Sequence, residues 1–130
     1  MARPPFEVRI KRVYDPPEEG DGVRILVDRL WPRGLRKERA AVTAWLKDLA
    51  PSSELRKWFG HDPARWAEFS RRYRSELARN HDAVAKLAGL SKGEPMTLLY
   101  AAHDTEHNHA LVLADYMRRH RKDFDGHHST

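Results

Sequence analysis

The sequence predicts an α/β fold, in which a compact single domain holds a small, mostly parallel sheet flanked by helices. Three observations predict it. Short apolar segments at 6–14, 23–27 and 96–102 have the character of strands. Over 63–80, large apolar side chains recur at three- and four-residue steps, which is typical of an amphipathic helix. Strands that alternate with helices along a chain favour a layered domain with parallel strands.

The first two strands lie close together in the sequence. Residues 6–14 alternate apolar and polar side chains, as a half-buried strand does. Residues 15–22 are rich in Pro and Gly and form a loop. Residues 23–27 are mostly apolar and predict a buried strand. Pro32 and Gly34 prevent its continuation.

The next stretch is less regular. Residues 35–43 have weak helical character, and 44–49 fit either a third strand or the end of that helix. Ser52 is a good N-cap for a short helix through Phe59, which Gly60 ends.

The second half contributes the clearest elements. The helix at 63–80 is followed by a short helix at 82–89 and by a buried strand at 96–102. A last helix begins after 103–105, with Asp104 or Thr105 as its N-cap, and ends near residue 119.

Composition limits the class of protein. The chain has 130 residues, 40% of them apolar, which suits one domain. We expect this domain at 1–120 and a polar, disordered tail at 121–130. With no cysteine there is no disulfide, thiolate nucleophile or cysteine-based metal site. The absence of an export signal and of a long apolar stretch predicts a cytoplasmic protein that does not enter membranes.

The charge alone suggests a polyanionic partner. The formal net charge is +5, from 24 Lys and Arg against 19 Asp and Glu. The basic excess is three in residues 1–50 and three in 51–100, whereas the last thirty residues carry −1. Because the excess is spread along the chain, the sequence favours solvated helix faces over a nucleic-acid site.

Polar clusters follow two of the strands, where ligands of parallel sheets bind. After the second strand come Asp28, Arg29, Arg33 and Gly34. Two guanidiniums beside a glycine turn suit a phosphate or carboxylate, so Arg29, Arg33 and Gly34 are predicted to bind an anion. Asp28 would orient an arginine or act in catalysis.

The second cluster follows the last strand. His103, Asp104 and His107 are candidate catalytic groups there, and Asn108 would bind the ligand beside a helix N-terminus. His61, on the loop after Gly60, would contribute from the flank. We therefore expect a small anionic ligand and leave open whether the protein is an enzyme.

Alternatives stay open for both clusters. Their residues also suit purely structural roles, as helix caps and ties between loops. A metal site at His103, Asp104, His107 or His109 is a further alternative, but the spacing fits it poorly, so the sequence predicts no metal and no cofactor. The four tryptophans would allow stacking on nucleic-acid bases, although such residues more often lie in cores. A partner-binding role and the oligomeric state are also left open.

Six segments together resemble a known family, at residues 12–15, 22–34, 45–52, 55–63, 98–102 and 107–110. On these motifs the chain resembles the YeaO-like family of bacterial proteins (DUF488, a domain of unknown function), over about residues 8–118. The resemblance implies a compact cytosolic α/β domain and brings no established activity. Related branches carry a cysteine near the equivalent of Tyr100. This chain has no cysteine, so the resemblance implies no thiol chemistry here.

Overall fold

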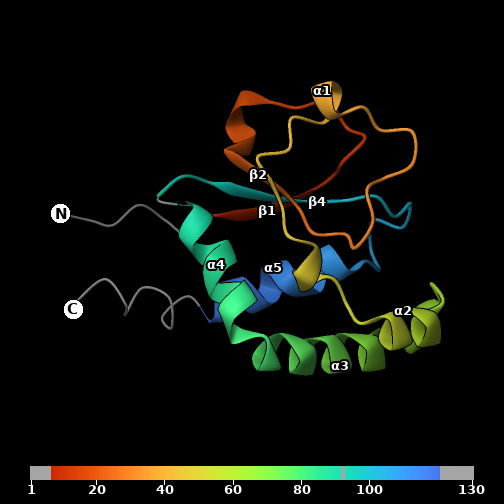
Figure 1. The fold of residues 1–130 in the computed structure, drawn as a ribbon. Helices are drawn as coiled ribbons and strands as arrows, with labels where there is room; N and C mark the ends of the chain where they lie inside the picture. Colours follow the sequence, from red (N-terminus) through yellow and green to blue (C-terminus); the bar gives the residue numbers. More distant parts are fainter. Residues whose placement is uncertain (1–6, 92, 121–130) are drawn as a thin grey trace, which may run out of the picture.

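Four parallel strands form the centre of the molecule (Figure 1). The structure is a computed structural model that describes residues 7–91 and 93–120. The strands are β1 (Val8–Arg12), β2 (Val23–Leu26), β3 (Ala44–Trp45) and β4 (Met96–Tyr100). The α-helices are α1 (Lys37–Ala40), α2 (Ser53–Phe59), α3 (Trp66–Arg79), α4 (His81–Ser91) and α5 (His109–Arg119). Short 3-10 turns lie at Glu19–Asp21, Lys47–Leu49 and Pro63–Arg65.

The strand order in the sheet is β1-β4-β2-β3. Met96 of β4 pairs with Val8 of β1 on one side and with Val23 of β2 on the other. At the edge, Ile25 of β2 pairs with Ala44 of β3. All three pairings are parallel, so the predicted α/β fold with a small parallel sheet is confirmed.

One face of the sheet packs on the long helices (Figure 1). Alternate strand residues point to this face, as the period of two in a strand requires. They include Val8, Ile25 and Leu98, and they meet apolar residues of α2 to α5 such as Phe69 and Leu113. This is the main hydrophobic core.

Irregular loops and the single turn α1 cover the opposite face (Figure 1). A second, smaller core lies there, formed by Val13, Leu26 and Leu99 with Trp31, Leu35, Val42 and Ala101 around them. The two faces of the sheet therefore differ, one packed on helices and the other on loops.

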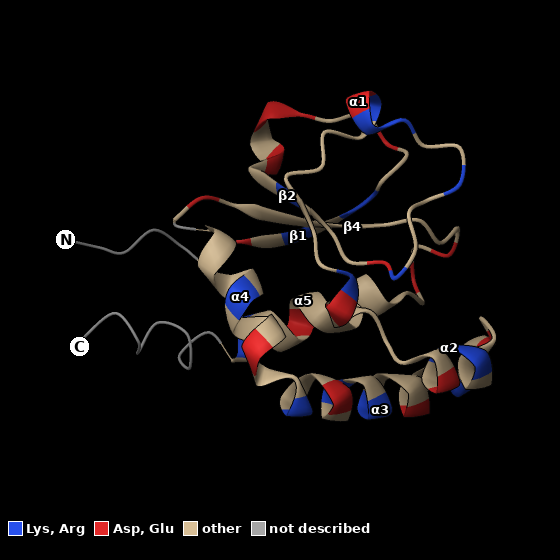
Figure 2. Cartoon of the chain, viewed as in Figure 1, with Lys and Arg blue, Asp and Glu red and all other residues tan. Residues whose placement is uncertain are grey.

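The surface charges on the helices are mixed in sign (Figure 2). Glu68 accepts hydrogen bonds from both Arg71 and Arg72, and Asp115 pairs with Arg74 and Arg119. Most cations of α3 and α5 are thus neutralised locally, as the sequence predicts.

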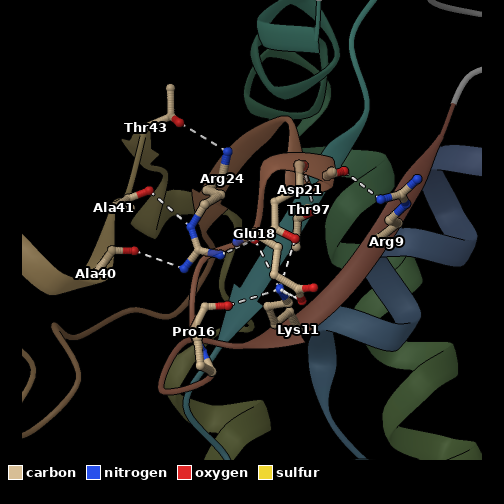
Figure 3. Close-up of polar contacts among 11 residues, drawn as sticks. Arg9, Lys11, Pro16, Glu18, Asp21, Arg24, Ala40, Ala41, Thr43 and Thr97 are labelled. Atoms are coloured by element: carbon tan, nitrogen blue, oxygen red, sulfur yellow. Dashed lines mark hydrogen bonds and ion pairs between the residues drawn. The ribbon is translucent and has the colours of Figure 1, made fainter.

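A buried ionic network joins Lys11 of β1, Asp21 of the 3-10 turn and Arg24 of β2 (Figure 3). Asp21 is 5% exposed and Arg24 only 4%. Asp21 accepts hydrogen bonds from Arg24 Nη1 at 2.5 Å and from Lys11 Nζ at 2.9 Å. Burial raises the pKa of the Asp21 carboxyl, but the hydrogen bonds from Lys11, the Glu18 backbone and Arg24 outweigh it and hold this pKa below its ordinary value. The network joins β1 and β2 to the loops above them.

Two capping predictions hold for α2. The Ser52 hydroxyl accepts a hydrogen bond from the Leu55 backbone, and Gly60 adopts the left-handed conformation that ends the helix. The third strand is real but only two residues long.

The predicted start of the last helix is wrong. Asn108, and neither Asp104 nor Thr105, is the N-cap of α5. The weak helix predicted at 35–43 is also shorter, because Ala41 adopts a left-handed conformation and ends α1 after four residues.

None of the helices in the described part of the chain combines the length and the apolar character needed to cross a bilayer. The predicted tail at 121–130 lies outside the described residues.

Candidate anion-binding cleft

The carboxyl ends of β2 and β4 meet beside a cleft of about 530 Å³. The Ala101 backbone N–H donates to Asp28 Oδ2 at 3.0 Å and joins the two strand ends. The cleft is lined by Asp28, Arg29, Leu30, Ala50, Pro51, Arg56, Lys57, Phe59, His61, Phe69, Ala101, Ala102, His107, Asn108 and His109. Five predicted site residues therefore line one cleft, namely Asp28, Arg29, His61, His107 and Asn108.

Asp28 is held by backbone and histidine, and not by an arginine as the sequence predicts. His109 Nε2 lies 3.2 Å from Asp28 Oδ1 and 3.0 Å from the Val27 carbonyl oxygen. Both neighbours are hydrogen-bond acceptors, so this nitrogen is placed to donate. The sequence singles out His109 only as an alternative metal ligand, because nothing local to it indicates a contact with the residues that follow β2.

His107 is fixed from two sides. Its Nδ1 lies 2.9 Å from Asp104 Oδ2, and its ring meets the edge of Trp66 with centroids 5.4 Å apart. The other oxygen of Asp104 accepts hydrogen bonds from the backbone N–H groups of Glu106 and His107. The Glu106 N–H, with His107, lowers the pKa of the Asp104 carboxyl below its usual value. Asp104 does not line the cleft itself but orients His107.

Asn108 is 3% exposed, and its side chain is engaged at both ends. Its Oδ1 accepts from the Leu111 backbone at 3.1 Å, and its Nδ2 donates to the Asp104 carbonyl at 3.0 Å. Burial raises the pKa of the Tyr100 hydroxyl, and Asn108 acts in the opposite direction. These bonds give Asn108 a structural part in shaping this wall of the cleft.

Three cations face the cleft, from Arg29 and from Arg56 and Lys57 of α2. None of the three has a carboxylate within 4 Å among the described residues. The sequence interpretation missed Arg56 and Lys57 because they sit on a helix far from both strand ends. Their only signal was their place in the family motif at 55–63.

Aromatic side chains supply an apolar wall. Phe59 and Phe69 stack with their ring centroids 4.4 Å apart, and both line the cleft. His61 follows Gly60 in a left-handed conformation of its own, with φ 58°, and its ring lies 6.1 Å from that of Phe59. The cleft therefore joins a cationic rim to an apolar side.

Besides Asp104, three predicted residues do not line this cleft, namely His103, Arg33 and Gly34. His103 is exposed. Arg33 is exposed too, and its carbonyl accepts a hydrogen bond from the Tyr14 hydroxyl. Gly34 has φ +75°, and no atom lies within 4 Å of the place where a Cβ would be. Glycine is therefore favoured here by the left-handed backbone conformation, and not by a neighbouring group that approaches too closely for a side chain.

The described residues contain no group of three or more His, Asp or Glu side chains arranged to hold a metal ion. His107 Nδ1 lies against Asp104, and His109 Nε2 lies against the carbonyl oxygen of Val27, just after β2.

Comparison with known proteins identifies relatives over most of the chain. Residues 7–130 match the family described as "Inactive DUF488-N3 subclade". "Uncharacterized protein YeaO" of Escherichia coli (strain K12) is 50% identical over 113 residues, which cover 87% of this chain and 98% of the relative. "Uncharacterized protein Mb3100c" of Mycobacterium bovis and "Uncharacterized protein Rv3073c" of Mycobacterium tuberculosis are each 45% identical over 115 residues, covering 85% of this chain and 92% of the relative. No solved structure matches the chain at a significant level. The chain therefore belongs to the YeaO-like proteins of the DUF488 family.

Proposed function

We propose that the protein binds a small organic anion in the cleft beside the carboxyl ends of β2 and β4, as a binding protein without turnover. The observation that carries the proposal is a set of three cations around one concave site, Arg29, Arg56 and Lys57, which have no carboxylate partner among the described residues. Asp28 is the one carboxylate among the residues that line this cleft; its Oδ2 accepts from the Ala101 backbone, and its Oδ1 lies 3.2 Å from His109 Nε2. An anion that enters therefore meets an excess of positive charge.

The apolar wall argues for an anion with a hydrophobic part. Pockets that bind small molecules commonly combine an apolar lining with a few placed polar groups. Here Phe59, Phe69 and Pro51 provide the apolar surface, and Arg29 provides bidentate hydrogen bonds for a carboxylate or phosphate. An aromatic or branched acid satisfies both sides of the cleft, whereas a bare inorganic ion satisfies only one.

The polar groups favour binding over catalysis. His107 Nδ1 lies against Asp104, His109 Nε2 lies against the Val27 carbonyl oxygen, and Asn108 caps a helix. The matching family is itself described as inactive. The proposed compartment is the cytoplasm, in keeping with a chain that has no cysteine for disulfides.

Calorimetric titration with phenyl phosphate, benzoate and inorganic phosphate tests the proposal. We expect phenyl phosphate to bind at least tenfold more tightly than inorganic phosphate, because only the ester reaches the Phe59 and Phe69 wall. Arg29→Gln removes a charge-assisted hydrogen bond worth about 1.5–3 kcal/mol, so its dissociation constant rises about 10- to 100-fold.

Arg79→Gln is the matched control, since Arg79 is an exposed cation of α3 that does not line the cleft. It leaves affinity unchanged. Equal losses in both variants, or no heat with any of the three anions, would contradict the proposed site. Release of phosphate from the ester would contradict binding without turnover.

A further inference from the structure

A second charged surface lies outside the cleft, on the loop side of the sheet. It consists of Arg33, Arg36, Lys37 and Arg39, which we call the basic loop. All four are exposed, and Glu38 is the one acidic residue between positions 29 and 47. Figure 2 shows these cations on α1 and the loop before it, on the opposite side of the sheet from α3.

The basic loop differs from the helices in how its charges are used. On α3, Arg71 and Arg72 pair with Glu68, and Arg74 pairs with Asp115. In the part of the chain that the structure describes, no cation of the basic loop has a carboxylate within 4 Å. Outside the cleft, the basic loop therefore gathers four unneutralised cations within seven residues of sequence.

Two exposed aromatic side chains flank the segment that leads into the basic loop. Trp45, 37% exposed, ends β3 at one edge of the sheet, and Tyr14, 43% exposed, follows β1 at the other edge. The Trp45 indole N–H donates to the Asp28 carbonyl at 2.7 Å, and the Tyr14 hydroxyl donates to the Arg33 carbonyl at 2.9 Å. Residues 28–33 thus connect the two aromatic positions. The two edge strands are three strand spacings apart, which separates these positions by about 14 Å.

Each aromatic residue also has a cation of its own. The Arg12 guanidinium lies 5.2 Å from the centre of the Tyr14 ring, and Lys47 Nζ lies 5.3 Å from the centre of the Trp45 ring. Aromatic side chains for stacking, interleaved with cations for phosphates, are the combination by which proteins bind single-stranded nucleic acid. An acidic protein or an anionic membrane surface would need the cations but not two separated rings.

We propose that this surface binds single-stranded nucleic acid, with bases stacked on Tyr14 and Trp45 and the phosphate backbone on the basic loop. The proposal does not depend on the cleft, because none of these residues lines it. Duplex DNA offers no unpaired bases to stack, so the surface discriminates against it.

Fluorescence anisotropy with labelled dT12 tests the proposal, at 50 and 200 mM salt. Replacing Arg33, Arg36, Lys37 and Arg39 together by Gln removes up to four phosphate contacts. The slope of log K against log salt then flattens by about 2.8, at about 0.7 per contact for a single strand. Replacing Arg71, Arg72, Arg74 and Arg79 together by Gln removes the same charge from α3, and we expect dT12 binding close to that of the wild type.

Trp45→Leu and Tyr14→Leu separate stacking from charge. Each weakens dT12 binding about 5- to 100-fold with an unchanged salt slope, and circular dichroism verifies that each variant is folded. Phenyl phosphate binding in the cleft is unaffected by the basic-loop variant. Three results would each overturn the proposal: no binding of dT12 at 50 mM salt, equal loss in the α3 variant, or equally tight binding of a 12-base-pair duplex or of polyglutamate.

Discussion

Asp21→Asn tests the buried ionic network most directly. The substitution keeps the shape of the side chain but removes the charge that compensates Arg24 and Lys11. Arg24 also donates to the Ala40 and Ala41 carbonyls, so its guanidinium cannot leave without breaking those hydrogen bonds. The variant therefore leaves a buried cation without its counter-ion.

Removing one partner of a buried ion pair costs about 3–5 kcal/mol of folding free energy. The upper part of this range applies to Arg24, whose side chain is 5% exposed. Lys11 adds less to the loss of folding free energy, because it keeps Glu18 as a partner at 2.7 Å. For a domain of this length, the loss lowers the melting temperature by about 10–15 °C.

Urea denaturation at pH 7 measures the change. Glu18→Gln is the control, since Glu18 is 72% exposed and its ion pair is worth under about 1 kcal/mol. A loss of folding free energy below about 1 kcal/mol in Asp21→Asn would refute the reasoning, because the buried network would then stabilise the fold no more than a surface ion pair does.

The same network predicts a dependence on pH. The folded-state pKa of Asp21 is depressed, so the stability that its charge supplies is present above the ordinary carboxyl pKa and is lost as pH falls through the folded value. The difference in free energy of unfolding between the wild type and Asp21→Asn should therefore stay constant from neutral pH to about pH 4 and shrink at lower pH.

Three further substitutions test single contacts by chemical denaturation. Gly22→Ala places a Cβ 2.1 Å from the Pro95 carbonyl oxygen at φ +65°, so it lowers the free energy of unfolding by about 3 kcal/mol or more. Gly93→Ala is the control, because φ there is +86° but the space is open, and it costs about 1–2 kcal/mol. Equal losses in the two variants would contradict the steric explanation. Asn108→Ala removes the N-cap of α5 and costs at least about 0.5–2 kcal/mol; an unchanged midpoint would mean that the cap is dispensable. Tyr73→Phe leaves a buried backbone carbonyl without its donor and costs about 1–3 kcal/mol, and a neutral result would show that water replaces the hydroxyl.

Local signals in the sequence were sufficient for most of the elements. Ser52 and Gly60 mark the two ends of α2 because capping depends on a few neighbouring residues. The parallel sheet follows from apolar strands separated by helices. The start of α5 did not follow, because Asp104, Thr105 and Asn108 are all good caps. Asp104 instead binds the His107 ring and the backbone just before the helix.

The candidate site was predictable only in part. Asp28, Arg29 and His107 follow strands that are neighbours in the sheet, and strand ends can be found in the sequence. The contact of His109 with Asp28 joins residues from opposite ends of the chain, and no local pattern reports it. Arg24 shows the same limit, because its place within an apolar strand makes sense only once Asp21 and the carbonyls of α1 are beside it.

The strand order has a consequence for how the protein is made. The central strand β4 is the last to be synthesised, yet both β1 and β2 hydrogen bond to it. During translation β1 has no neighbour in the sheet until about ninety residues later, and only β2 and β3 can pair early. Contacts so distant in the sequence close slowly. A chain that is truncated before residue 96 therefore has a first strand that cannot be paired. The edge of this strand is then exposed to aggregation or proteolysis.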